Sequence, residues 1–580
     1  MDSALECHRQ ALAIRERLAP DSLDVADTLS RIGGLYMEEG DWERGSESLT
    51  RAALTLERAR AQVAAPMDRT GLTSQAGGVF DQLVCLLAAR KPQEAFEWQE
   101  RGRARALVEQ SAERWVDFGA GAPQELVGEQ QQLDAQRDSL QSHLLRAVQE
   151  GDEDQVTQLR AELALLQGKQ DDLAARIRRS SPRYAALQYP DPPSLLEMQK
   201  ALDAGTLLLS YTAAPESTGL FALDSAGGLT VHRCVLSAGE LEGQVRRLRA
   251  AVSGRQPWLG LAQALYRDLI APVADRVAKA QRLLIIPDKS LHYLPFCLLA
   301  DGRGKLLGDR KPIHYAQSVS VYAAVRKDAD RPREQPPLLA MAFGDPVYAE
   351  SSSPEGAARA GAYTRAYFAS RGLEFSRLPR SGQEAQAICD LFAPLSTAFL
   401  REQATEEKAK QEAGKARLLH FACHGYIDPE RPMNSALVLT LPGEAEQAQE
   451  NGFLQTYEVY GLKLNADLVT LSACETGLGK ELGGEGIVGL TRAFMYAGAP
   501  SVMVSLWKVA DESTAELMKA FYGHLKRGAS KDAALQSAMS DLRRRPEYAH
   551  PYYWAPFILY GDWRPVETAQ PRGSAAPKGQ

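Results

Sequence analysis

The stretches ARLLHFACHG, residues 416–425, and DLVTLSACETG, residues 467–477, decide the fold of this chain. Each is an apolar run of strand length that stops on a reactive side chain, with a glycine close behind. If the two runs are neighbouring parallel strands, their carboxyl ends bring the imidazole of His424 and the thiol of Cys474 to one edge of a sheet. Open α/β sheets place their sites at that edge. The pattern therefore predicts a parallel sheet with a reactive pair at its carboxyl edge.

The thiol of Cys474 has to be activated before it can act as a nucleophile. A free thiol with a pKa of about 8.5 is mostly protonated at neutral pH, so Cys474 needs a base within hydrogen-bond reach. The next predicted helix begins only near residues 484–486, too far along the chain for its dipole to act, which leaves His424 as the base. Gly425 has no side chain, so its N–H group can approach a substrate carbonyl and form an oxyanion hole with the N–H group of Cys474. The layout predicts a Cys/His hydrolase.

Other readings of these residues stay open. A cysteine in a strand is commonly a small buried apolar residue, and His420, inside the first run, is expected to be a hydrogen-bonded core histidine. His420, Cys423, His424 and Cys474 together have the residue types of a zinc site. Strand alternation weighs against zinc, because it directs Cys423 and His420 to opposite faces of the strand. We therefore predict no metal ligands here.

Three motifs carry a family resemblance: HFACHG at 420–425, LSACETG at 471–477 and SLWKVADESTAELMKAFY at 505–522. They resemble the CHAT domain, the bacterial relative of caspases and separases that usually follows tetratricopeptide repeats (TPRs). The resemblance implies a caspase-like α/β domain and a cysteine endopeptidase whose His/Cys dyad is His424 and Cys474, with no cofactor. It also implies control by a partner protein, in a bacterial defence or cell-death system.

The third motif also resembles a separase segment in which an acid after a Leu-Trp pair binds the substrate arginine that precedes the cut. The matching position is Asp511, and the implied specificity is cleavage after Arg or Lys. The plain alternative is that Asp511 caps the helix predicted over 511–526. Lys508 stands where separases carry an acid, so the match to that segment is incomplete.

The alternation of small and large residues over positions 1–112 predicts TPR-like helix pairs. In such pairs, small residues let the two helices approach closely. The chain opens on what reads as the second helix of a repeat, so we expect an uncovered apolar face, through truncation or because another subunit covers it. We expect this region to dock a regulatory protein. The small and large positions of the repeat are Leu29, Ile32, Gly33, Tyr36, Gly45, Leu49 and Ala52.

Residues 113–188 are charged and Gln-rich, with leucines at heptad spacing on both sides of a break at 151–154. This pattern predicts an antiparallel helical hairpin, acting either as a spacer or as a partner-binding coiled coil. Prolines at 190–193 then end the helical half. The fold class is thus α followed by α/β.

From 189 to 564 predicted strands alternate with helices, which indicates a mostly parallel sheet covered on both faces. A helix over 261–280 should break at Pro272, and His292 is expected to be structural. We predict a mobile loop at 351–361 and a disordered tail at 565–580. The glycine-rich loop at 477–486 lacks the Gly-Lys-Ser/Thr ending of a phosphate-binding loop and is expected to order when substrate or activator arrives. Other expected elements are the strands 206–212, 219–223, 229–234, 282–287, 338–343 and 500–506, and the helices 238–252, 487–496, 511–526 and 531–544.

Composition narrows the function classes further. The 580-residue chain has a net charge of −7, so we expect no direct nucleic-acid partner. Its seven cysteines are scattered without CxxC pairs, which fits a reducing cytoplasm. The sequence contains no apolar run long enough to predict a membrane-spanning helix. The rivals to a peptidase acting on a protein substrate are an inactive CHAT scaffold that only binds a partner, and a Cys-dependent acyltransferase or peroxidase.

Overall fold

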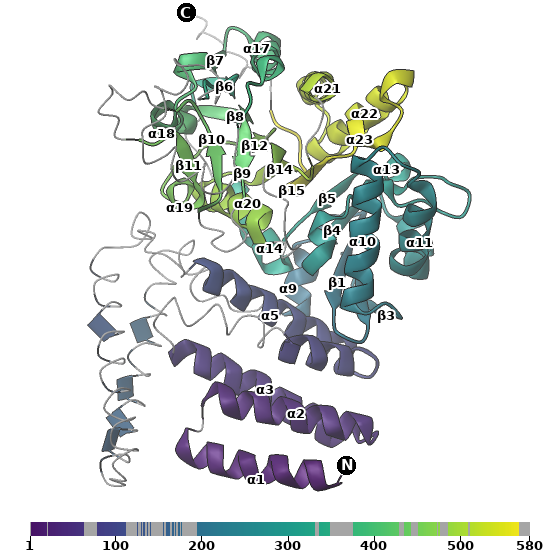
Figure 1. Ribbon diagram of the computed structural model, residues 1–580, viewed down its shortest axis with the longest axis vertical. Coiled ribbons are helices and arrows are strands. Elements are labelled where there is room, and N and C mark those ends of the chain that lie inside the picture. Colours follow the sequence, from purple (N-terminus) through teal and green to yellow (C-terminus); the bar gives the residue numbers. More distant parts are fainter. Residues whose placement is uncertain are drawn as a thin grey trace, which may run out of the picture. The chain divides into compact units, whose positions relative to one another are not determined.

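The computed structural model divides the chain into two compact units, each described here by itself (Figure 1). The first comprises residues 1–204, 209–240 and 318–324, and the second comprises 205–208, 241–317 and 325–580. The structure describes residues 2–19, 21–62, 78–111, 194–330, 336–348, 375–427, 434–441, 450–472, 474–475, 485–507 and 511–567, together with isolated positions between 125 and 176.

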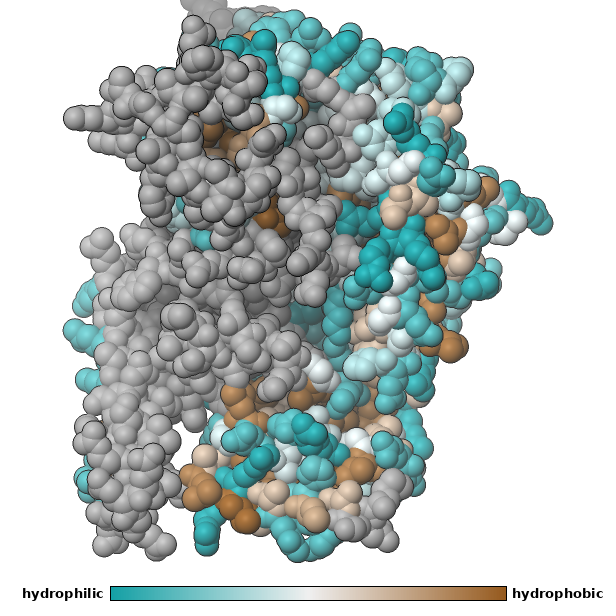
Figure 2. Space-filling model, viewed as in Figure 1, coloured by the Kyte–Doolittle hydropathy of each residue, from teal (hydrophilic) through white to brown (hydrophobic). Residues whose placement is uncertain are grey.

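The first unit begins with a stack of antiparallel helices, drawn purple to blue in Figure 1. The apolar side chains of Leu5, Ile32 and Tyr36 pack the first helix against the second. Ile14 and Leu18 of the first helix are 55% and 48% exposed, and Figure 2 shows brown side chains gathered on the surface of these helices. The helices are α1 (Asp2–Leu18), α2 (Leu23–Glu38), α3 (Trp42–Gln62), a helix over 78–88 and α5 (Pro92–Ser111).

Two glycines allow α2 and α3 to approach closely. A Cβ atom added at Gly33 would lie 2.7 Å from Cγ of Leu49, and one added at Gly45 would lie 3.0 Å from Sδ of Met37. Both distances are too short for an undisturbed van der Waals contact. The close approach of α2 and α3 therefore explains why the predicted repeat has small residues at Gly33 and Gly45.

The neighbouring glycines 33 and 34 offer a matched test of this packing. Gly33→Ala should separate α2 from α3 and lower the free energy of unfolding by about 1–3 kcal/mol, as overpacking typically does. Gly34→Ala meets nothing within 4 Å and should raise it by up to about 1 kcal/mol, because alanine is the better helix former. Urea unfolding of both variants checks this. Equal effects would show that the helices do not depend on close approach.

Most of the predicted hairpin at 113–188 lies outside the described residues. The described positions between 125 and 176 are helical, and Leu133, Leu159 and Leu166 among them are buried. Arg176 pairs with Glu129 at 2.8 Å, so the beginning of the segment meets its end. A contact between the two ends of the segment is the one expected for an antiparallel pair of helices.

Helix α5 is bound to one strand and to the start of one helix of the first unit through a buried polar network. Ser210 Oγ donates to Gln99 Oε1 at 2.8 Å, and Arg103 Nη1 donates to Ser210 Oγ at 2.7 Å. Glu100 accepts the N–H groups of Val319 and Ser320, at 2.8 and 3.1 Å. These bonds explain why the first unit continues past residue 189 into strands. Those elements are α9 (Leu195–Lys200), β1 (Thr206–Ala213), β2 (Thr218–Asp224), β3 (Thr230–Cys234) and the start of α14 (Val319–Ala329), with β2 and β3 antiparallel.

The second unit is built on eight adjacent strands in the order β4-β5-β15-β14-β12-β8-β6-β7. The five strands from β14 to β7 are parallel, while β15 is antiparallel to β14 and parallel to β5. The sheet is mostly parallel, as predicted, but the sequence does not predict the change of direction at β15. The strands are β4 (Arg282–Ile286), β5 (Ile313–Tyr315), β6 (Leu338–Gly344), β7 (Ser396–Leu400), β8 (Ala416–Ala422), β12 (Leu468–Leu471), β14 (Ser501–Ser505) and β15 (Phe557–Gly561).

Aromatic side chains fill the core beside these strands. The ring of Phe343 stacks on Phe421 at 5.0 Å and on Phe399 at 5.1 Å, joining β6, β8 and β7. Strands buried on both faces need such continuous apolar runs, which is why the sequence located them. The predicted break at Pro272 is confirmed. A short 3₁₀ turn that contains Pro272 separates α11 (Leu259–Leu269) from α12 (Ala274–Lys279). The other helices are α10 (Ala238–Ser253), α13 (Leu307–Arg310), α17 (Pro379–Phe392), α18 (Glu406–Glu412), α19 (Thr456–Val459), α20 (Glu485–Ala497), α21 (Asp511–Lys526), α22 (Lys531–Arg543) and α23 (Pro551–Trp554), with short 3₁₀ turns at Ala271–Val273, Lys289–Tyr293, Phe296–Leu298, Arg401–Gln403, Ala413–Lys415 and Pro546–Tyr548.

Several predictions fall on residues that the structure does not describe. The predicted mobile loop at 351–361 lies there, as do most of the glycine-rich loop at 477–486 and most of the tail at 565–580. Within the described part of the chain, no helix combines the length and the apolar character needed to cross a bilayer.

Candidate active site

The two strands that introduce the site are neighbours. Strand β8 pairs in parallel with β12, with Leu418 opposite Leu468 and Phe421 opposite Leu471. Both strands are almost entirely buried. The predicted pairing is therefore confirmed, and both strands deliver their following residues to the same edge of the sheet.

Beyond that edge the chain forms a second, small sheet that the sequence did not reveal. Its order is β11-β10-β9-β13, and β13 pairs in parallel with β9. In this pairing Cys474 is the Cα partner of His424, and Glu475 is the Cα partner of Gly425. Paired strands lie about 4.8 Å apart, so the main chains of His424 and Cys474 are adjacent. The strands are β9 (His424–Tyr426), β10 (Ala436–Val438), β11 (Phe453–Gln455) and β13 (Cys474–Glu475).

The imidazole of His424 is buried and held by a main-chain carbonyl. Its Nε2 lies 2.6 Å from the carbonyl oxygen of Ser376. A carbonyl can only accept a hydrogen bond, so Nε2 must carry the proton. In the neutral ring the basic nitrogen is then Nδ1, which is buried as well. This carbonyl fixes the tautomer, and no sequence pattern points to it, because a backbone acceptor leaves no mark on residue type.

His420 has a different role from His424. Its Nε2 lies 2.8 Å from Glu384 Oε1 and its Nδ1 lies 3.2 Å from the hydroxyl of Tyr522. The side chain is only 1% exposed. The expectation of a hydrogen-bonded core histidine is confirmed. With both ring nitrogens engaged, His420 is not placed to complete a zinc site with Cys423 and His424.

An acidic cluster surrounds one lysine on the second unit. Lys410 Nζ lies 2.7 Å from Glu406, 2.6 Å from Glu450 and 2.8 Å from Glu458. Burial, together with the two neighbouring carboxylates, raises the pKa of Glu406 to about 8 despite the lysine. Among the described residues these three acids alone come close enough together to hold a metal ion, and the lysine ammonium lies against all three.

Asp511 is the first residue of α21, on the chain that leaves β14. Strand β14 lies next to β12, so this segment starts at the sheet edge after which His424 and Cys474 follow. The segment is anchored at Leu506, whose N–H donates to the carbonyl of Pro556 at 2.8 Å and whose carbonyl accepts from Arg249 at 2.7 Å. The side chains of Cys474 and Asp511 lie outside the described residues. His292, expected to be structural, lies 3.1 Å from the hydroxyl of Tyr560.

Comparison with known proteins bears on this arrangement. A family model described as CHAT domain matches residues 259–562, more than half of the chain. The chain belongs to the CHAT-domain family. The match begins at α11 and ends just after β15, so it takes in the strands of His424 and Cys474 and the segment before Asp511.

This CHAT chain is also similar to Tetratricopeptide repeat protein 28. It is 25% identical to the Homo sapiens protein over 342 residues, and 25% identical to the Mus musculus protein over 345 residues. Each match covers 52% of this chain and 13% of the relative, so the chain spans a small part of the curated relatives' length.

Two solved structures are similar with low TM-scores. The Saccharomyces cerevisiae separase–securin complex aligns with a TM-score of 0.38 and 12% identity, over 96% of this chain and 48% of that one. The Arg specific cysteine proteinase gingipain R aligns with a TM-score of 0.31 and 10% identity, over 57% of this chain and 75% of that one.

Proposed function

We propose that this CHAT protein is a cysteine endopeptidase in which His424 and Cys474 form the catalytic dyad. The observation that carries the proposal is the parallel pairing of β9 with β13, which makes the two residues Cα partners. A nucleophile on the strand next to its base needs only rotation of its own side chain to come within hydrogen-bond reach. No residue of this scheme requires a metal or an organic cofactor.

The steps follow from the tautomer of His424. Its Nδ1 takes the proton of the Cys474 thiol, and the sulfur attacks the scissile carbonyl carbon to form a tetrahedral oxyanion. The N–H groups of Gly425 and Cys474 stabilise that oxyanion. When the carbon–nitrogen bond breaks, Nδ1 returns the proton to the leaving amine. Water then hydrolyses the thioester, with His424 again acting as the base.

The simplest test replaces Cys474 by alanine and measures cleavage by the purified protein. A peptidase loses its turnover, whereas an inactive CHAT scaffold keeps its cellular effect without the thiol. A Cys-dependent acyltransferase would lose its activity too, but it would release no new peptide termini in the wild type. The outcome therefore separates the three functions.

We also propose that the substrate residue before the cut is Arg or Lys, bound by Asp511. A carboxylate in a desolvated pocket favours arginine through a bidentate pair, binds lysine more weakly and repels aspartate. Asp511→Ala should lower kcat/KM for an Arg substrate about a hundredfold, as loss of a buried ion-pair partner does. A fluorogenic peptide library varied at that residue measures this.

A matched control lies one residue further on. Glu512, whose side chain is 60% exposed, is in the same first turn of α21. Glu512→Ala should therefore keep the preference for arginine. A wild type that prefers Asp or large apolar residues would contradict the role of Asp511, and so would an Asp511→Ala enzyme that keeps its Arg preference.

The helical region is proposed to receive a regulatory protein that raises activity. Support comes from the repeat-like packing of α2 and α3 and from the exposed apolar residues Ile14 and Leu18. A surface of this kind suits a protein partner, and we propose a partner from a bacterial defence system in the cytoplasm. Cys474-dependent cleavage measured with and without a candidate partner tests the idea, and equal rates contradict it for that partner.

A further inference from the structure

Tyr348, which follows β6, joins two strands of the small sheet through its hydroxyl group. The hydroxyl accepts the main-chain N–H of His424 at 3.2 Å and donates to the carbonyl of Val438 at 3.1 Å. His424 and Val438 are Cα partners in the antiparallel pairing of β9 with β10. The tyrosine thus bridges two facing residues of the ladder at the residue that carries the proposed base.

The ring of Tyr348 contacts the imidazole as well. The two ring centroids are 5.0 Å apart, and Phe375 packs on the imidazole at 5.5 Å. Tyr348 and Phe375 also contact each other at 6.0 Å. The residue after Phe375 is Ser376, whose carbonyl binds Nε2. The imidazole is therefore fixed by two aromatic rings and one carbonyl, and its main chain is fixed by the tyrosine hydroxyl.

These contacts lie in a buried apolar cluster. Tyr348, Phe375 and Val438 belong to it and are at most 9% exposed. Water has little access to the N–H of His424 or to the carbonyl of Val438 if the hydroxyl is removed. An unsatisfied buried polar group is costly, so the local structure should shift to find new partners.

We infer that Tyr348 is a positioning residue for the reaction, which holds His424 in register with Cys474 through its hydroxyl group. This inference rests on the proposed peptidase function. The hydroxyl binds main-chain groups of His424 and Val438, so it acts on the reaction through the place of the imidazole. Near-attack geometry is sensitive to displacements of about 1 Å, which can cost about a hundredfold in rate.

The test is Tyr348→Phe, which removes the hydroxyl and keeps the ring. We expect kcat to fall about ten- to a hundredfold with KM changed less than twofold, because the variant keeps Asp511, the proposed substrate-binding residue. Each rate is divided by the number of protein molecules whose Cys474 is alkylated by iodoacetamide. A purely structural defect would reduce the number of such sites and leave the rate per site unchanged.

Tyr522→Phe is the matched control. It also removes a buried hydroxyl with two bonds, to Thr470 Oγ1 at 2.8 Å and to His420 at 3.2 Å, but it does not touch His424. It should lose stability to a similar degree and keep kcat per site. If Tyr348→Phe keeps a kcat within twofold of Tyr522→Phe, the inference is wrong.

Failure of the peptidase proposal would look different. In that case the wild type shows no cleavage that depends on Cys474, whatever residue 348 is. The alkylation rate of Cys474 at neutral pH then still tests the inference, because an imidazole held beside the thiol speeds thiolate formation. A rate lowered in Tyr348→Phe and normal in Tyr522→Phe supports positioning, and equal rates in all three proteins overturn it.

Discussion

Cys474→Ala should lower cleavage of a peptide substrate at least about a thousandfold, because removal of a catalytic nucleophile leaves only binding and oxyanion stabilisation. His424→Ala should be nearly as damaging, since the thiol then lacks its base. The double variant should be no worse than Cys474→Ala, because the two residues act as one unit. Turnover of a fluorogenic peptide by the purified, activated protein measures all three effects.

The control is Cys389, a buried cysteine that cannot act as a nucleophile at neutral pH. Burial raises the pKa of the Cys389 thiol to about 12, so it is not a thiolate at neutral pH. Cys389 lies on α17 and packs against Ala342 and Ala385. Cys389→Ala should keep its turnover per folded molecule. If Cys474→Ala cleaves at the wild-type rate, another group is the nucleophile.

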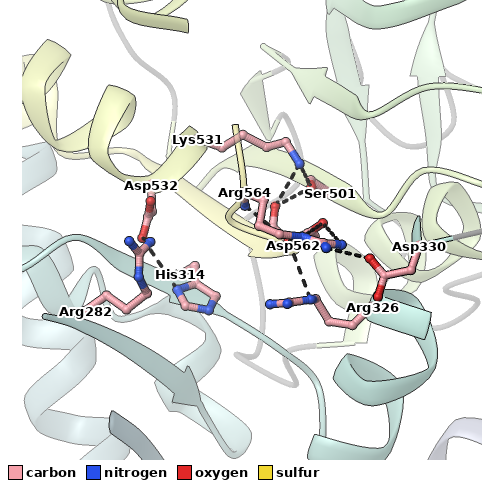
Figure 3. Close-up of polar contacts among 9 residues, drawn as sticks. All are labelled: Arg282, His314, Arg326, Asp330, Ser501, Lys531, Asp532, Asp562 and Arg564. Carbon is pink, nitrogen blue, oxygen red and sulfur yellow. Dashed lines mark hydrogen bonds and ion pairs between the residues drawn. The ribbon is translucent and has the colours of Figure 1, made fainter. Parts of the chain in front are cut away.

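Asp562→Asn should cost the protein about 3–5 kcal/mol of unfolding free energy, because it leaves buried Lys531 and the partly buried Arg326 and Arg564 without their counter-charge. Asp562 follows β15 and is 4% exposed. Figure 3 shows its carboxylate among Arg564, Arg326 and Lys531. Arg564 Nε lies 2.9 and 3.0 Å from the two carboxylate oxygens, and Lys531 Nζ donates to the carbonyl of Asp562 at 3.0 Å.

The same cluster predicts acid sensitivity with a definite sign. Burial works to raise the pKa of Asp562, but Lys531, Arg564 and Arg326 outweigh it and lower the pKa to about 2. A carboxyl with a depressed folded pKa stabilises the fold above its unfolded pKa of about 3.9. Roughly 2–3 kcal/mol should therefore be lost as the pH falls from about 5 to 2. The amide side chain of the Asp562→Asn variant does not titrate, so this part of the loss should be missing there.

Asp330 offers the control for this experiment. It binds the same Arg564, at 2.5 Å, but its side chain is 59% exposed. Asp330→Asn should cost less than about 1 kcal/mol, as exposed ion pairs usually do. Urea unfolding of both variants between pH 2 and pH 7 measures the difference. Equal costs would mean that burial of the Asp562 cluster contributes nothing.

The sequence locates the main strands and helices because their residues carry local signals. Strands β4, β8, β12 and β14 are apolar runs of the right length, and the bounds predicted for α21, 511–526, are those that the structure shows. The small sheet escapes detection because β9 and β13 have three and two residues, too few for a period. The direction of strand β15 could not be predicted, because it depends on which neighbouring strand β15 pairs with.

The proposed dyad could be located from the ends of two apolar runs, but its surroundings could not. Tyr348 and Ser376 come from other elements, and they meet His424 only through the fold. A carbonyl acceptor such as that of Ser376 has no sequence signal at all. Residue type predicts which chemistry is present, whereas tautomer and position depend on distant partners.

We propose that this protein cuts other proteins through Cys474. Mapping of new protein termini in cells that express either the wild type or Cys474→Ala tests it most directly, with the proposed regulatory partner present. The account predicts a set of termini found only with the wild type, most of them following Arg or Lys. Identical termini in both cells, with the wild-type cellular effect kept by Cys474→Ala, would contradict the claim and favour a binding scaffold.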